Sequence, residues 1–450
     1  MYRFAALTAF ILGSAASAFA AAPVAETRAA EPGKACEGFG PNFFSATLVP
    51  ACIKLGAELR AGFGKDFAPR DIALVSQRLP TVADPNGGVP MLFYYLKDFR
   101  DRTRTIRPVL DGQVNFTAVA ATDYGPVSVY ANVRGTLEYI QNSHPRFETN
   151  STTRGAVQNV LDQAWVKFAG FTAGIYPSFF NFTQAGYSFS GAYSSSRKTP
   201  ILGYSYRFSD YAVASLSLED PNRRRTQDGL LASYANVRAP DVVGQFRFGN
   251  SATLFQIAGA WHQIRDHAAS NCCAAPVSTK TGWAVSAGGE YRTKWSDVFG
   301  EQAGDMYGRF MLTGAYTSGA LSYLGMPYFA LDYVAEANGR LHLTRGYSTV
   351  ASYEHLWNPS LKSTLTWSAY RASMHSDLSD ILNGNLVNFG YRVRGQALQF
   401  STEYMIRPDL MVGGEVSQYH DKATGTFSGI AGAAAKVTNY NLLAYVRKLY

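Results

Sequence analysis

After its first residues the sequence lacks long apolar stretches, and it is poor in charge. Beyond Ala22 no uninterrupted apolar run reaches the roughly 20 residues that a membrane-spanning helix needs, which excludes a helical membrane protein. Charged residues are 16% of the chain, against about 25% in ordinary soluble proteins. Basic residues outnumber acidic ones by 41 to 33 but are spread along the chain, so the composition does not favour nucleic-acid binding.

Motifs for catalysis and for cofactor binding are missing as well. The chain has no Gly-x-Ser-x-Gly elbow and no Walker loop. None of its seven histidines stands in an H-x-x-x-H or H-E-x-x-H pattern or at ligand spacing from a cysteine. We therefore expect no enzyme activity, no cofactor and no metal, and a barrel enzyme built on one of the many serines is kept as an alternative.

Cysteine is scarce, with four residues in the chain. Cys36 and Cys52 close a short loop and are the natural disulfide pair in an exported protein. Cys272 and Cys273 are adjacent, so they allow three states: a strained vicinal disulfide, pairing with another chain, or free thiols. The sequence leaves these three states open.

The N-terminal residues predict export. Residues 4–22 are almost wholly apolar or small, Arg3 precedes them, and residues 18–20 (AFA) form an A-x-A cleavage site. We expect residues 1–20 to be a signal peptide and residues 21–35 to be a linker-like lead. No linker, composition shift or charge block divides residues 105–450, so residues 36–450 are predicted to form one domain.

The sequence is instead rich in aromatic residues, glycine and period-two alternation. Aromatics are 14% of the chain, with 28 Tyr, 28 Phe and 41 Gly. Apolar and polar side chains alternate over segments about as long as a membrane-crossing strand of 9–11 residues, at 53–63, 127–139, 255–262, 410–417 and 440–450. A membrane barrel directs the apolar set to lipid and the polar set to the lumen. The predicted lumen wall includes Lys54, Glu58, Arg60, Arg134 and Glu138.

The segments between these strands alternate between short and long. Compact turns rich in Gly, Asn, Asp and Pro lie at 121–125, 208–211, 249–251, 358–360 and 407–409. Long polar connections lie at 64–104, 141–156, 177–199, 221–236, 265–280, 317–345, 374–392 and 421–437. Eight loops on one side and seven turns on the other predict an all-β, transmembrane antiparallel β-barrel of about sixteen strands. The turn near 293–305 is longer than this scheme expects.

Four parts of the chain resemble the general porins of alphaproteobacteria, of the Rhizobiales type. They are residues 36–40 with 52–56 (CEGFG, CIKLG), residues 165–174 (WVKFAGFTAG), residues 239–244 (APDVVG) and residues 403–410 (EYMIRPDL). The resemblance covers the whole mature chain in order. It implies a sixteen-stranded barrel, usually a homotrimer, whose third long loop folds into the channel and narrows it.

By position this inward-folded third loop is residues 177–199. Its candidate constriction residues are Phe179, Phe180, Asn181, Phe182, Tyr187, Arg197 and Lys198. Related loops often carry several acids, but this one has none. With Arg60 and Arg134 then uncompensated on the wall, we expect weak anion preference or near-neutral selectivity, unless Glu58 and Glu138 restore the balance.

The sequence therefore predicts a porin of the bacterial outer membrane, a passive water-filled channel for ions and small hydrophilic solutes. A barrel enzyme and a non-porin barrel for adhesion or assembly are the alternatives. The expected partners are outer-membrane lipid and lipopolysaccharide, and further copies of the chain. Residues 223–225 (RRR) are either a solvated loop or a contact for lipopolysaccharide phosphates, because arginine forks suit phosphate.

Overall fold

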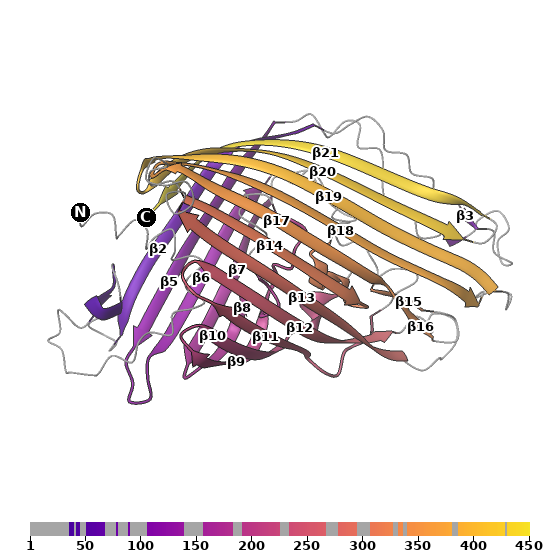
Figure 1. The fold of residues 1–450 in the computed structure, drawn as a ribbon, viewed down its shortest axis with the longest axis horizontal. Helices are drawn as coiled ribbons and strands as arrows, with labels where there is room; N and C mark the ends of the chain where they lie inside the picture. The colour runs from indigo at the N-terminus through magenta and orange to yellow at the C-terminus, as the bar shows by residue number, and fades with distance from the viewer. Residues whose placement is uncertain are drawn as a thin grey trace.

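The computed structural model places the chain in one large antiparallel sheet that closes on itself (Figure 1). It describes residues 36–39, 42–45, 51–67, 78–79, 89–90, 106–138, 156–182, 191–225, 234–266, 278–294, 307–326, 332–335, 340–379, 386–427 and 430–450. The expected signal peptide (1–20) and lead (21–35) lie outside the described residues, as do Tyr187, Cys272 and Cys273.

Sixteen strands of the described residues form the barrel, and each pairs with the next one along the barrel wall. They are β2 (Cys52–Phe67), β5 (Ile106–Ala120), β6 (Val127–Glu138), β7 (Ala156–Phe168), β8 (Phe171–Pro177), β9 (Lys198–Ser209), β10 (Ala212–Glu219), β11 (Asp241–Gly249), β12 (Thr253–Asp266), β13 (Ser278–Lys294), β14 (Tyr307–Ser318), β17 (Arg345–Asn358), β18 (Leu361–Ser379), β19 (Leu386–Arg407), β20 (Leu410–Phe427) and β21 (Ile430–Leu449). The last strand pairs with the first, from Tyr440 opposite Phe67 to Leu449 opposite Glu58. This pairing closes the barrel and confirms the predicted fold class.

Alternation along each strand separates an outer face from an inner face. On β2 the side chains of Leu55, Leu59 and Phe63 are exposed. Glu58 and Arg60 point to the other side and are mostly covered. The same alternation recurs around the barrel, with exposed large apolar side chains on the outer face of most strands. An apolar outer face around a polar interior is the arrangement of a barrel in lipid and the reverse of a soluble sheet.

The predicted short turns join their strands where expected. Two to six residues connect β5 to β6, β9 to β10, β11 to β12, β17 to β18 and β19 to β20. Between β7 and β8, Ala169 and Gly170 both have positive φ, 47° and 85°, as in a tight type I′ hairpin. Gly170 is required there twice over, because a Cβ would also lie 2.7 Å from the carbonyl oxygen of Ser205.

Two predicted long loops are wrong. The sequence predicts loops at 374–392 and 421–437, but strands fill most of both ranges. β18 continues to Ser379 and β19 begins at Leu386, while β20 continues to Phe427 and β21 begins at Ile430. Beyond the apolar band water touches both faces of a strand, so its sequence no longer alternates and resembles a polar loop.

The barrel wall is uneven in height (Figure 1). β8 and β10 have 7 and 8 residues, whereas β19 and β21 have 22 and 20. A tilted strand needs about 9–11 residues to cross a bilayer. The strands β8 and β10 therefore lie in a low stretch of wall, and β18 to β21 form a high one.

Short elements complete the described chain. They are η1 (Glu37–Phe39), β1 (Phe44–Ser45), β3 (Arg78–Leu79), β4 (Val89–Pro90), η2 (Pro221–Arg224), η5 (Leu321–Leu324), β15 (Tyr333–Ala335) and β16 (Leu341–Leu343). The predicted disulfide between Cys36 and Cys52 is present, and it ties the residue before η1 to the first residue of β2. β1 pairs with the same end of β2. Among the described residues, no helix has the length and apolar character needed to cross a membrane.

Candidate functional site

A belt of paired charges follows the inner face of the barrel. On β5 the carboxylate of Asp111 accepts a hydrogen bond of 2.8 Å from Arg134 Nε on β6. On its other side Asp111 lies 3.7 Å from Arg60 on β2, and Arg60 also pairs with Glu58 at 3.1 Å. Each of these cations thus has an acid in contact with it.

The belt continues on the opposite side of β2. Lys362 on β18 lies 2.7 Å from Glu403 and 3.4 Å from Glu354. Arg309 on β14 pairs with Glu354 at 3.5 Å, and Arg447 on β21 pairs with Glu403 at 3.2 Å. We call these residues, together with those of the previous paragraph, the charged belt. Its members are Glu58, Arg60, Asp111, Arg134, Arg309, Glu354, Lys362, Glu403 and Arg447.

The charged belt corrects the expected electrostatics of the wall. The sequence predicts Arg60 and Arg134 to be uncompensated unless Glu58 and Glu138 restore the balance. In the structure Glu58 pairs with Arg60, and Asp111, which the sequence did not indicate, contacts both arginines. Five cations face four acids in the charged belt, so its formal charge is 5 − 4 = +1. The field of two opposite charges in contact falls off with distance faster than the field of a lone charge.

Two other predicted wall residues lie outside this belt. Lys54 shares the inner face of β2 with Glu58, and its ammonium group stands 5.9 Å from the ring centroid of Phe43, near the disulfide. Glu138 is the last residue of β6, and its side chain is outside the described residues. The structure therefore brings Glu58, Arg60 and Arg134 together, and it does not bring Lys54 to them.

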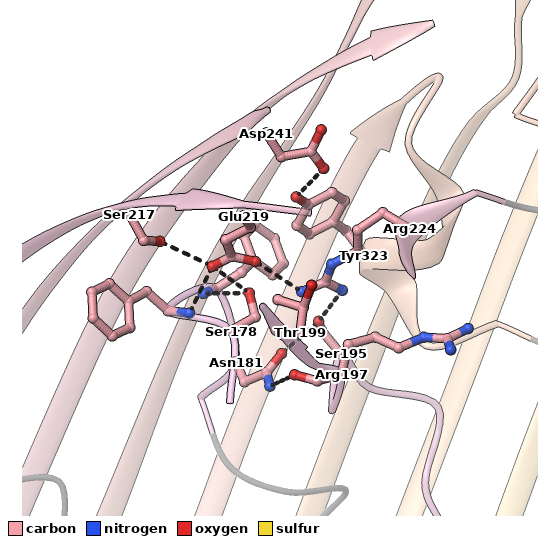
Figure 2. A network of polar contacts seen from close by, with 12 residues as sticks. Ser178, Asn181, Ser195, Arg197, Thr199, Ser217, Glu219, Arg224, Asp241 and Tyr323 are labelled. Atoms are coloured by element: carbon pink, nitrogen blue, oxygen red, sulfur yellow. Dashed lines mark hydrogen bonds and ion pairs between the residues drawn. The ribbon is translucent and has the colours of Figure 1, made fainter. Parts of the chain in front are cut away.

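The predicted third loop begins where β8 ends at Pro177 and returns where β9 begins at Lys198. Its first residues are fixed to Glu219 on β10 (Figure 2). Ser178 Oγ donates to Glu219 Oε1 at 3.0 Å and the backbone N–H of Phe179 donates to the same atom at 3.1 Å. A third donor, Ser217 Oγ, reaches that oxygen at 3.0 Å. A buried carboxylate with this many donors is a strong anchor.

The other oxygen of Glu219 faces a buried arginine from η2. Arg224 Nη2 lies 3.7 Å from Glu219 Oε2, and Arg224 Nη1 donates to Ser195 Oγ at 3.1 Å. The guanidinium also stands 4.1 Å from the ring centroid of Tyr323 on η5, whose hydroxyl donates to Asp241 at 2.7 Å. Figure 2 shows these groups converging from β10, η2, η5, β11 and the third loop. One buried ion pair thus joins both ends of the third loop to η2 and η5.

This network also corrects the interpretation of residues 223–225. Arg224 is completely buried, so neither a solvated loop nor a lipopolysaccharide contact describes it. Arg225 donates to the carbonyl oxygen of Ala235 at 2.9 Å. Arg223 is the exposed member of the three.

Backbone oxygens of the first loop residues are held by inner-face side chains of β11 and β12. Gln245 Nε2 donates to the Phe179 oxygen at 2.7 Å, and Gln256 Nε2 donates to the Asn181 oxygen at 3.2 Å. The rings of Phe179 and Phe180 are buried in one apolar cluster with residues of the wall. Phe182 is buried in a second cluster.

The returning part of the loop contacts a different part of the wall. The backbone N–H of Tyr193 donates to Ser368 Oγ on β18 at 3.1 Å, and its hydroxyl donates to Asp421 on β20 at 2.9 Å. Burial raises the pKa of Tyr193 well above its ordinary value, so this hydroxyl keeps its proton. On β19, Gln399 Nε2 donates to the carbonyl oxygen of Gly191 at 3.3 Å.

The two predicted loop cations lie at the end of the loop. Lys198 is the first residue of β9 and pairs with Asp162 on β7. The carbonyl oxygen of Arg197 accepts from the Ser178 N–H at 3.0 Å and from Asn181 Nδ2 at 2.9 Å. The loop has no acid of its own, and the wall supplies one at each contact, Glu219 and Asp421. Sequence reasoning missed both of these acids and Asp111.

The inner face offers no site for a metal among the described residues, where no three His, Cys, Asp or Glu side chains are arranged to hold one. The polar groups are instead distributed along the wall as ion pairs and hydrogen-bonded amides.

Comparison with known proteins gives the chain a family. The sequence pattern of the porin subfamily matches residues 21–442. In structure the barrel is similar to the outer membrane channel DcaP of Acinetobacter baumannii, with a TM-score of 0.59, 15% identity, and coverage of 90% of this chain and 99% of that one. An anion-selective porin from Comamonas acidovorans has a TM-score of 0.48 and 8% identity over 89% of this chain and 100% of that one. No curated protein matches in sequence. The chain belongs to the porin subfamily and is a β-barrel protein of the outer membrane.

Proposed function

We propose that the chain forms a passive, water-filled channel through which ions and small hydrophilic solutes diffuse, and that it is not an enzyme. The observation that carries this proposal is the arrangement of the barrel wall, which has apolar side chains on its outer face and the charged belt on its inner face. The charges of this wall are paired with one another, and such a wall supports diffusion of many solutes. Liposomes containing the purified chain should swell in small sugars and not in large dextrans, and swelling equal to that of empty liposomes contradicts the proposal.

We further propose that the third loop folds inward as the constriction of this channel. Its first residues contact β10, β11 and β12, and its return contacts β18, β19 and β20. All of these contacts use side chains of the inner face. Residues 177–182 and 191–199 are thus held at two separate parts of the inner face, as expected of a loop that narrows the channel.

The low stretch of wall supports a proposal about assembly. With 7 and 8 residues, β8 and β10 are too short to cover the hydrocarbon band. Their outer face and that of β9 carry exposed Phe171, Tyr204, Tyr206 and Leu216. We infer that other copies of the chain cover this apolar face in a homotrimer. Light scattering of the detergent complex measures three chains if this is correct and one if it is not.

The paired belt supports the near-neutral end of the selectivity expected from the sequence. Because Asp111 and Glu58 neutralise Arg60 and Arg134, the wall supports no strong preference of either sign. We propose near-neutral selectivity with a small anion bias from the formal charge of +1 in the charged belt. Reversal potentials across a salt gradient test this directly.

A further inference from the structure

Three cations stand side by side across the high stretch of wall. Arg371 on β18 lies opposite Arg394 on β19, and Arg394 lies opposite Lys422 on β20. We call these three residues the basic row. Directly opposed residues in an antiparallel sheet have their Cβ atoms about 4.5–5.5 Å apart, so the row is a continuous line of like charge.

The basic row belongs to the outer face. Strand residues separated by an even number of positions share a face. Arg371 therefore lies on the face of the exposed Trp367, and Arg394 lies on the face of the exposed Leu398. Both arginine side chains are themselves exposed. The register carries this placement to Lys422 on β20, because opposed residues point to the same side of a sheet.

We call a line of directly opposed residues across β17 to β21 a rung. No acid lies on the rung that contains the basic row or on the next rung of the same face on either side. The rung of the basic row begins with Tyr347 on β17. The rung on one side holds Arg345, Ser373, Arg392, Thr424 and Ala434. The rung on the other side holds Thr349, Ala369, Gln396, His420 and Thr438. Arg371, Arg394 and Lys422 form no ion pair with another described residue.

Such a row is costly by itself. Like charges directly opposite each other destabilise a sheet. The chain avoids this cost on its inner face, where each cation of the charged belt lies within 3.7 Å of an acid. On the outer face no acid of the described residues compensates the basic row, which leaves the row open to an anion from outside the chain.

The height of the basic row indicates what that anion is. Arg371 is 371 − 361 = 10 residues from the start of β18, which lies at a short turn. At about 3.3 Å per residue and a tilt near 40°, this is about 25 Å above the turn. The apolar band of such barrels is also about 25 Å tall, and its short turns face the periplasm. The basic row therefore lies at the outer edge of the hydrocarbon, at the level of outer-leaflet headgroups.

We propose that the basic row binds the phosphate groups of a phosphorylated glycolipid of the outer leaflet, of the lipopolysaccharide class. Arginine forks hold phosphate oxygens in pairs, and lysine adds a mobile point charge. Neighbouring residues of the row are close enough to share one phosphate. A bound headgroup removes the repulsion within the row and fastens the long strands to the lipid layer.

The test compares two variants of the full-length protein in detergent. The row variant carries Arg371→Gln, Arg394→Gln and Lys422→Gln. The control variant carries Lys65→Gln, Arg223→Gln and Arg238→Gln, which removes the same charge away from the row. The measurement is the affinity for diphosphorylated lipid A at low and moderate salt. We expect the row variant to bind at least about tenfold more weakly, since three charge-assisted contacts are lost, and the control to bind like the original protein.

Other outcomes overturn the proposal. Equal affinity of the row variant and the original protein does so, and so does an equal loss in the control variant. Full displacement of lipid A by millimolar inorganic phosphate would show a site for free anions instead. Equal binding of lipid A from which the phosphates have been removed would show an apolar contact instead. Conductance of the row variant should be unchanged, so this test is independent of the channel function.

Discussion

The carboxylate of Glu219 lies 3.7 Å from the guanidinium of Arg224, and neither side chain is exposed to solvent. The two residues come from β10 and η2, yet through Ser178 and Ser195 they hold both ends of the third loop. A buried ion pair of this kind contributes little net stability, but removing one partner is strongly destabilising because the other charge stays buried.

Glu219→Gln should loosen the third loop. The change leaves the guanidinium of Arg224 buried without its partner, which costs about 3–5 kcal/mol when the surroundings cannot relax. We expect a lower unfolding temperature and noisier single-channel currents. Arg223→Gln, at the exposed neighbouring position, is the control and should change neither. Quiet currents in Glu219→Gln would show that the loop does not depend on this anchor.

Asp111→Asn should change ion selectivity rather than folding. The substitution keeps the shape of the side chain and raises the formal charge of the charged belt from +1 to +2, while Arg60 and Arg134 lose their shared acid. We expect the reversal potential in a KCl gradient to move toward anion preference. Asp123→Asn, in the exposed turn between β5 and β6, is the matched control. A shift toward cations, or an equal shift in the control, contradicts the account of the charged belt.

The two faces of β5 should respond differently to the same new charge. Val114 is exposed on the outer face, so Val114→Arg places a cation against hydrocarbon at a cost of about 2–4 kcal/mol near the midplane. Asn115→Arg, on the inner face of the same strand, lies opposite Gly56 and Asn132 and should fold normally. Denaturant titration in lipid vesicles measures both. Equal loss of stability in the two variants would mean that the assigned faces are wrong.

The disulfide between Cys36 and Cys52 should act locally. Its sequence separation is 16 residues, and a loop of this length stabilises by about 3 kcal/mol in the chain-entropy model. Replacing both cysteines with serine should release the segment around η1 to proteases and leave conductance intact. Peptide mapping without reductant should recover the linked peptide from the original protein, and free thiols at both positions would refute the pairing.

The alternation of the sequence was sufficient to predict the barrel and its two faces. Leu55 and Leu59 alternate with Glu58 and Arg60 in the sequence, and the structure keeps these two sets on opposite faces. Local patterns also placed most turns, because Gly, Asn, Asp and Pro act within a few residues. The ends of β18 to β21 were missed because alternation stops where lipid stops.

The pairings within the barrel could not be read from the sequence. Asp111 meets Arg60 and Arg134 only because three strands align in one register, and no local signal fixes that register. Arg224 is buried because Tyr323, which is far along the chain, covers it. A run of three arginines looks like an exposed loop until that contact is known.

Single-channel recording tests most directly whether this barrel is an open diffusion channel. The purified full-length protein is added to a planar lipid bilayer in 1 M KCl under a small constant voltage, and folding is checked by heat-modifiable migration in gels. We expect stepwise current increases of uniform size that vary linearly with voltage and with salt concentration. Folded, inserted protein that passes no steady current would contradict the account.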